Sequence, residues 1–223
     1  MTHSSSRKLS NGALATIIVV AAVVIDQLIK IYVKTHFYIG EEYRVTSWFR
    51  ILFIENNGMA FGMELGSKFF LTWFRIIAVG LLIWYLCRLR HRTDAPRGYV
   101  VCIALITAGA LGNVIDCIAY GLLFNSPFPP QVAQLLPPDG GYGTLFHGRV
   151  VDMFYFPLVE WNWPSWMPWV GGEHFLFFEP VFNFADACLS VSVIVLILFY
   201  TRQLSGEPKQ GQSAEPEAEK KEE

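Results

Sequence analysis

Apolar residues in this chain gather into four long blocks, separated by segments rich in polar residues, glycine and proline. The blocks cover residues 12–33, 69–89, 98–119 and 182–200. Each has close to the ~20 residues that an α-helix needs to cross the hydrocarbon core of a bilayer. The pattern therefore predicts an all-α membrane protein with four transmembrane helices.

Composition supports this prediction, and the placement of positive charge orients the helices. Hydrophobic residues make up 53% of the chain and charged residues only 16%. Basic residues flank the blocks at the N-terminus, between the second and third blocks, and after the fourth: Arg7, Lys8, Arg88, Arg90, Arg92, Arg97 and Arg202. The positive-inside rule places these regions in the cytoplasm. Both termini are then cytoplasmic, and segments 36–68 and 120–181 lie outside.

We expect one membrane domain over residues 1–203, in which the two outer segments form an extracytoplasmic, partly β loop region. The first apolar block continues past Asp26 without a small-residue cleavage site, so we interpret it as an uncleaved helix. Residues 204–223 are charged and poor in apolar residues, which predicts a disordered tail. Tryptophans of the second outer segment are expected to anchor it at headgroup depth: Trp161, Trp163, Trp166 and Trp169.

Carboxylates lie at one end of three of the four blocks. Asp26 is in the first block, Asp116 in the third and Asp186 in the fourth, and the alternating directions of the helices bring all three to the outer side. Asp152 lies in the outer segment between the last two blocks. A carboxylate at membrane depth is costly and by default indicates a functional site. We therefore expect a site built from acids near the outer face.

Other kinds of site have little support in the sequence. Cysteines and histidines show no metal-ligand spacing, so neither a metal nor an organic cofactor is implied. The net charge of −2 gives no basic footprint for nucleic acid, and none is expected as a partner. Membrane lipid is the expected partner of the predicted helices.

Acids gathered at one membrane face fit three functions. Two carboxylates held close share a proton and can activate a water, as in aspartic proteases. A transporter would use them to relay protons or bind cations, and a scaffold would bind a partner through its outer loops. The transporter is disfavoured because no acids continue to the cytoplasmic side and no inverted repeat is visible. The residues alone leave Asp152 and Asp186 equally open to catalysis and to a structural polar pair.

Five short motifs, in order along the chain, resemble those of the bacterial lipoprotein signal peptidases, also called signal peptidase II. They are Asp26-Gln27-Leu28-Ile29-Lys30, Glu55-Asn56-Asn57-Gly58-Met59-Ala60-Phe61-Gly62, Gly109-Ala110-Leu111-Gly112-Asn113-Val114-Ile115-Asp116, Val150-Val151-Asp152-Met153-Phe154 and Phe182-Asn183-Phe184-Ala185-Asp186. Each motif alone is weak, but five in order, together with four predicted helices, are specific.

The resemblance implies a membrane-embedded, metal-independent aspartic endopeptidase. By that resemblance Asp152 and Asp186 are the catalytic pair, which activates a water for attack on the scissile bond. The implied substrate is a prolipoprotein whose cysteine already carries a diacylglyceryl group, cut on the amino side of that cysteine. The implied location is the bacterial inner membrane, with the active site towards the outer face. A monomer is expected, as is inhibition by cyclic peptides of the globomycin type.

Further residues in and near the motifs are expected to bind substrate or support the site: Asp26, Lys30, Asn57, Gly58, Phe61, Asn113, Asp116, Arg149 and Asn183. Asp26 and Lys30 are four residues apart, so they share one helix face and can form an ion pair. Asparagine side chains can orient the acids, because an amide both donates and accepts hydrogen bonds.

The chain departs from the family's usual pattern at two places. Cys117 follows Asp116 where the family usually has arginine, and Arg149 is our hypothesis for the missing positive charge. Segment 121–149 is longer than usual and contains five prolines, so we expect an inserted outer loop. Arg75 interrupts the second apolar block, and its role is open at this level.

Overall fold

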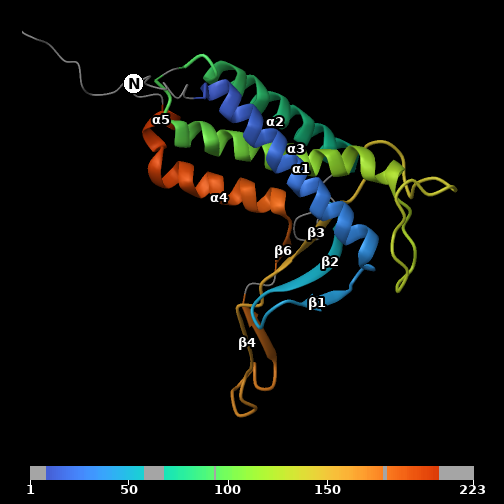
Figure 1. The fold of residues 1–223 in the computed structure, drawn as a ribbon. Helices are drawn as coiled ribbons and strands as arrows, with labels where there is room; N and C mark the ends of the chain where they lie inside the picture. Colours follow the sequence, from blue (N-terminus) through green and yellow to red (C-terminus); the bar gives the residue numbers. More distant parts are fainter. Residues whose placement is uncertain (1–8, 58–67, 93, 178–179, 206–223) are drawn as a thin grey trace, which may run out of the picture.

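Helices form most of the protein in a computed structural model that describes residues 9–57, 68–92, 94–177 and 180–205. Four long helices lie side by side in Figure 1, and the short α5 (Thr201–Ser205) follows the last of them. The long helices are α1 (Asn11–His36), α2 (Lys68–Leu89), α3 (Arg97–Leu123) and α4 (Phe184–Phe199). Helix α3 packs against the other three and forms the centre of the bundle.

Three of these helices, α1, α2 and α3, are long and apolar enough to cross a membrane. Helix α4 is apolar but has only 16 residues. Large apolar side chains on the outward faces are strongly exposed, for example Phe74 at 70% and Leu198 at 66%, as expected for contact with lipid. A mostly helical membrane fold is therefore confirmed, whereas the count of four spans stays a prediction.

Local sequence signals explain where two of the helices begin. The Ser10 hydroxyl accepts a hydrogen bond from the Ala13 N–H at 3.2 Å and caps α1. Helix α4 begins with a capping box, in which the Asn183 side chain accepts from the Asp186 N–H and the Asp186 carboxylate accepts from the Asn183 N–H. Each bond satisfies a backbone donor that the first turn of a helix would otherwise leave free.

Two glycines of the third motif allow α3 to approach its neighbours closely. A Cβ at Gly109 would lie 2.3 Å from the Ala185 carbonyl oxygen, and a Cβ at Gly112 would lie 2.5 Å from Asp26 Oδ2. The clash at Gly109 is with backbone, so that position requires glycine as long as α3 and α4 keep this spacing, whereas a Cβ at Gly112 would force the Asp26 carboxylate to move. The glycines thus bring the acids of α1 and α4 against α3.

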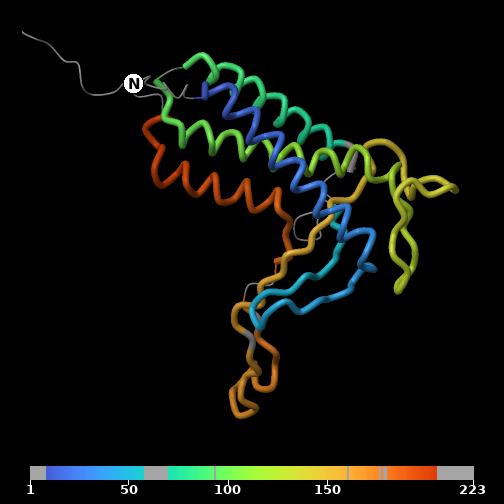
Figure 2. Tube along the Cα trace, viewed as in Figure 1, coloured from blue at the N-terminus to red at the C-terminus, as the bar shows by residue number. Residues whose placement is uncertain are grey.

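A four-stranded antiparallel sheet lies at one end of the bundle, where α1 and α3 end and α2 and α4 begin (Figure 1; the trace is clearest in Figure 2). We call this end the sheet end. The strand order is β1 (Glu42–Arg44), β2 (Arg50–Asn56), β3 (Val150–Tyr155) and β6 (Val181–Phe182). Phe53, Val151 and Met153 are buried from the sheet against Tyr120 and Phe124. This small core fixes β3, and with it Asp152, against the end of α3.

Strands β4 (Val159–Asn162) and β5 (His174–Phe177) form a separate antiparallel hairpin that projects away from the bundle in Figure 1. Trp161 stacks on Phe175 across the hairpin, with ring centroids 4.3 Å apart. Trp166 and Trp169 lie in the turn and are almost fully exposed. The expected partly β region is confirmed, with its strands in both predicted outer segments.

Candidate active site

The polar residues of the motifs converge at the sheet end of the bundle. Helix α1 carries Asp26 and Lys30 there, α3 carries Asn113 and Asp116, and α4 begins with Asn183 and Asp186. Strand β3 adds Asp152, which is paired with Ile54 of β2. The convergence expected from helix directions alone is therefore present, and it extends to the acid that lies outside the apolar blocks.

Lys30 is the centre of one buried cluster. Its Nζ lies 2.9 Å from Asp26 Oδ2 and 2.7 Å from Asp116 Oδ2, and it donates to Asn113 Oδ1 at 2.8 Å. The Lys30, Asp26 and Asp116 side chains are all at most 1% exposed. Gln27 adds hydrogen bonds to both acids, at 3.1 and 2.9 Å. Asp26 and Asp116 are thus held as ion pairs with a cation that water does not reach.

Asp152 and Asp186 have a different environment, made of amides. Asn56 Nδ2 donates to Asp152 Oδ2 at 3.2 Å, and Asn183 Nδ2 donates to Asp152 Oδ1 at 2.7 Å. Asn113 Nδ2 donates to Asp186 Oδ1 at 2.7 Å. Among the residues that the structure describes, neither acid forms an ion pair. This pair is therefore oriented without being neutralised.

The hydrogen-bond network fixes the orientation of two of these amides. Asn113 Oδ1 accepts from Lys30 Nζ and from Asn183 Nδ2, at 2.8 and 3.2 Å, so its Nδ2 must face Asp186. Asn183 Oδ1 accepts from the Asp186 N–H at 2.9 Å, which turns its Nδ2 towards Asp152. A lysine cannot accept and a backbone N–H cannot accept, so the assignments leave no alternative. The Lys30 cluster thereby orients the donors of the second pair.

Burial raises the pKa of Asp152 to about 7, from an ordinary value of 3.8. The negative charge of Asp186 acts in the same direction, because a like charge disfavours ionisation. The hydrogen bonds from Asn56 and Asn183 and the charge of Lys30 act in the opposite direction. Asp152 is consequently protonated in a large part of the molecules at neutral pH, and the pair can hold one proton between them.

The β2 asparagine that donates a hydrogen bond to Asp152 is Asn56. From the sequence we had selected the next residue, Asn57. Strand periodicity could have found it: Ile54 is opposite Asp152, so Asn56 lies on the same face of β2, while Asn57 lies beyond the end of the strand. Gln27 lies in the first motif but was not selected as a site residue, because its role depends on its contact with Asp116 of α3. The predicted site residues Gly58 and Phe61 lie outside the described residues.

Arg149, our hypothesis for the missing positive charge, has Glu55 as its ion-pair partner. Its Nη1 pairs with Glu55 Oε2 at 2.8 Å, because β2 and β3 place residue 55 opposite Val151. A different arginine reaches Cys117: Arg75 Nη1 donates to Cys117 Sγ at 3.1 Å. Arg75 therefore brings its guanidinium from α2 to the residue where the family usually has an arginine of its own.

Metal binding has no support among the described residues, where no group of three His, Cys, Asp or Glu side chains is arranged to hold an ion. The fold and the site define a helical membrane protein with a small sheet at one end of the helix bundle and a carboxylate pair held by amides where the sheet meets the helices. A carboxylate pair with one raised pKa is typical of acid–base hydrolysis by water.

Comparison with known proteins names the family. A family model described as signal peptidase (SPase) II matches residues 18–202, and the chain therefore belongs to the signal peptidase II family of membrane proteases. It is 50% identical over 198 residues to the lipoprotein signal peptidase of Porphyromonas gingivalis, covering 89% of this chain and 87% of that protein. It is 35% identical over 188 residues to the lipoprotein signal peptidase of Amoebophilus asiaticus, covering 81% and 75% of the two chains.

Solved structures show the same fold. Two bacterial membrane enzymes superpose with TM-scores of 0.57 and 0.54, at 24% and 26% sequence identity. They cover 89% and 82% of this chain, and the chain covers 94% and 90% of them. The arrangement of helices and sheet is therefore shared over nearly the full length of both neighbours.

Proposed function

We propose that this protein is an aspartic endopeptidase that removes signal peptides from diacylglyceryl-modified prolipoproteins, cutting on the amino side of the lipidated cysteine. The observation that carries the proposal is the Asp152–Asp186 pair, held by three asparagines and without an ion-pair partner in the described part of the chain. The names of the relatives support the class of substrate.

In this proposal the two acids divide the work according to their surroundings. Asp152, whose pKa burial raises to about 7, holds the proton and donates a hydrogen bond to the carbonyl oxygen of the scissile bond. Asp186 is ionised and takes a proton from the attacking water. The tetrahedral intermediate then collapses as Asp186 returns a proton to the leaving nitrogen. No metal or covalent intermediate takes part.

The site's location suits a substrate that is itself anchored in a membrane. Asp186 lies in the first turn of α4, where the apolar helix meets β6 of the sheet. A lipidated signal peptide would present its scissile bond at a similar depth, near the headgroups. The proposal includes four spans, cytoplasmic termini, and the sheet end at the outer face of the bacterial inner membrane. A monomer and inhibition by globomycin-type cyclic peptides belong to the same proposal.

The experiment is cleavage of a diacylglyceryl-modified prolipoprotein in detergent, with a chelator present, compared with the same prolipoprotein without lipid. Wild type is expected to cut only the lipidated form. Asp152→Asn and Asp186→Asn keep the side-chain shape and should lose at least about 1,000-fold in rate. Asp139→Asn is the matched control, because Asp139 is exposed in the connection between α3 and β3.

Two results would count against the proposal in different ways. A folded Asp152→Asn or Asp186→Asn enzyme with near-normal activity would mean that this pair is not catalytic, and Asp26 and Asp116 would need testing. A wild-type enzyme that never cuts the lipidated substrate would reject the activity itself.

A further inference from the structure

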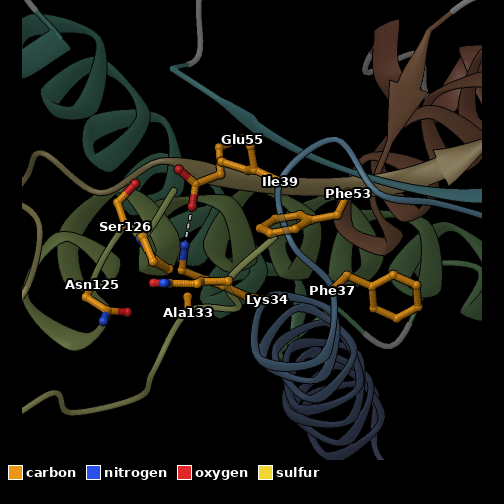
Figure 3. Close-up of a pocket in the computed structure, with 10 residues that line it drawn as sticks. Lys34, Phe37, Ile39, Phe53, Glu55, Asn125, Ser126 and Ala133 are labelled. Carbon is orange, nitrogen blue, oxygen red and sulfur yellow. Dashed lines mark hydrogen bonds and ion pairs between the residues drawn. The ribbon is translucent and has the colours of Figure 1, made fainter. Parts of the chain in front are cut away.

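A second buried ion network lies at the sheet end, outside the pair of catalytic acids. Glu55 of β2 is its centre: Oε1 binds Nζ of Lys34 on α1, and Oε2 accepts from Arg149 Nη1 at 2.8 Å. Figure 3 shows Lys34 and Glu55 in direct contact, among the residues that line a small pocket together with Asn125 and Ser126. The Lys34 and Glu55 side chains are 1% and 3% exposed, and Arg149 is 36% exposed.

This network is costly to keep buried, so its geometry must be well satisfied. Both carboxylate oxygens of Glu55 have a cationic partner. The ammonium of Lys34 also lies 5.2 Å from the ring centre of Phe124 and 5.3 Å from that of Tyr142, within the range of cation–π attraction. Replacing such groups by apolar residues often leaves stability unchanged or improves it, so the network suggests a purpose other than stability.

The purpose follows from the position of Glu55 in the sheet. Glu55 is paired with Val151, next to Asp152, and the adjacent Asn56 donates directly to the Asp152 carboxylate. The pairing of β2 with β3 shifts register between Ile51 and Ile54. Beyond this shift the ladder resumes, with Ile54, Glu55 and Asn56 opposite Asp152, Val151 and Val150. The Glu55 side chain adds a further constraint to this short stretch, because it ties the stretch to Lys34 of α1 and to Arg149.

The same anchor holds the long connection 124–149. The Arg149 N–H donates to the Tyr142 hydroxyl at 2.7 Å, and Arg149 Nη1 donates to Ser126 Oγ at 3.4 Å. Gly148 N–H donates to the Cys117 carbonyl at 2.8 Å, so the connection is tied to α3 immediately before β3 begins. Glu55 therefore joins α1, β2 and this connection at one point, one residue from the asparagine that contacts Asp152.

We propose that Glu55, clamped between Lys34 and Arg149, is a positioning residue that aligns Asn56 with Asp152 and couples the 124–149 connection to the reaction. The proposal rests on the proposed function. It gives the long connection a role in the geometry of the site, and it assigns chemistry to three residues outside the family motifs or at their edge.

The charged groups around Asp152 determine what loss of this alignment would do. Asp186 on α4 and Lys30 on α1 act on Asp152 through their charges, and Asp116 on α3 lies 3.5 Å from the Val151 nitrogen beside it. None of these groups changes when Glu55 is replaced. The bond from Asn56 is lost, and because that bond lowers the pKa of Asp152, the pKa should rise.

The test compares Glu55→Gln with Glu42→Gln in the lipidated-substrate assay over a range of pH. Glu42 is the matched control, since its Oε1 accepts from Arg50 Nη1 at 2.9 Å on the same sheet but at an exposed site. Glu55→Gln should lower kcat by about 10-fold to 100-fold, the usual effect of a small misplacement, with a smaller change in KM. Its activity should persist to higher pH than that of wild type. Glu42→Gln should stay within about twofold of wild type.

Further variants keep the test decisive if Glu55→Gln folds poorly. Lys34→Met with Glu55→Met replaces the buried pair by apolar groups and leaves Arg149 able to reach water, so folding should be retained. Arg149→Met should give a smaller loss of kcat in the same direction, and Arg149→Lys should restore part of it.

The proposal would be overturned by a folded Glu55→Gln or Lys34→Met/Glu55→Met enzyme with wild-type kcat and an unshifted pH profile. A fall in kcat with neither a pH shift nor rescue by Arg149→Lys would also reject it, because a merely stabilising network would behave in that way. The protonation of Asp152 can be followed without activity, as the carboxylic acid infrared band that Asp152→Asn removes. That band separates failure of the clamp from failure of the proposed reaction.

Discussion

Two pairs of aspartates occupy the same end of this protein, and the main difference between them is the kind of side chain that contacts them. Asp26 and Asp116 share the ammonium of Lys30, whereas Asp152 and Asp186 accept hydrogen bonds from neutral asparagines. Burial alone does not separate the pairs, since Asp152 is as buried as Asp26 and Asp116, all at most 2% exposed, while Asp186 is only half-buried. A buried cation stabilises the ionised state, while an amide orients a carboxylate without removing its ability to exchange a proton. The comparison supports our proposal that Asp152 and Asp186 are the reactive pair and that Asp26 and Asp116 are structural.

Removing one carboxylate from each pair gives the sharpest test of this division. Asp152→Asn or Asp186→Asn should abolish cleavage, by at least about 1,000-fold, in a protein that remains folded. Asp26→Asn should retain measurable cleavage in its folded fraction, because Lys30 keeps Asp116 as a partner. The measurement is initial rate per folded enzyme, after size-exclusion chromatography. Equal losses of cleavage rate from variants of the two pairs would contradict the division into a structural and a reactive pair.

Replacing Lys30 should lower the stability of the fold more than it lowers the rate of cleavage by the folded protein. Lys30→Met leaves Asp26 and Asp116 buried without their shared partner, and breaking a buried ion pair in this way typically costs about 3–5 kcal/mol. The unfolding temperature in detergent should fall markedly. Lys30→Met combined with Asp116→Asn should recover part of the loss, since one uncompensated charge is then removed. A Lys30→Met protein as stable as wild type would show that the two acids need no cation for folding.

Asn183 connects the two regions, so its loss should show in both stability and pH dependence. Asn183→Ala removes the cap of α4, which is worth about 1 kcal/mol, and it removes the 2.7 Å bond to Asp152. Because that bond lowers the pKa of Asp152, the pKa should rise in the variant. Asn183→Asp retains a capping oxygen but adds a negative charge beside Asp152, and it should shift the profile further. An unchanged pH profile in a folded Asn183→Ala enzyme would contradict the assigned contact.

The smallest effect is expected from pH itself in the wild-type enzyme. Asp152 must be protonated to act as the acid, and burial raises its pKa to about 7. Activity should therefore be retained below this pH and decline as the pH rises through about 7. Kinetics from pH 5 to 9 in one detergent would measure the decline. Activity that stays constant as the pH rises through 7 would mean that Asp152 is not the acid.

The positions and directions of the helices could be inferred from the sequence, whereas the partner of Arg149 could not. Apolar blocks at 69–89 and 98–119 correspond to α2 and α3, since length and hydrophobicity act locally along a helix. The convergence of Asp26, Asp116 and Asp186 followed from helix direction alone. The sequence suggested Arg149 as a source of positive charge but did not give its partner, because strand pairing between β2 and β3 decides that it meets Glu55.

The sequence by itself determined the membrane class, the positions of the long helices and the set of acids, because each depends on residues near one another in the chain. Only the tertiary structure decided which acids share Lys30, that Asn56 reaches Asp152, and that Arg75 reaches Cys117. The bond from Asn56 to Asp152 joins residues 96 positions apart, and the one from Ala185 to Asp26 joins residues 159 apart. A carboxylate's chemistry depends on the charges and donors within a few ångströms, and those neighbours are chosen by packing.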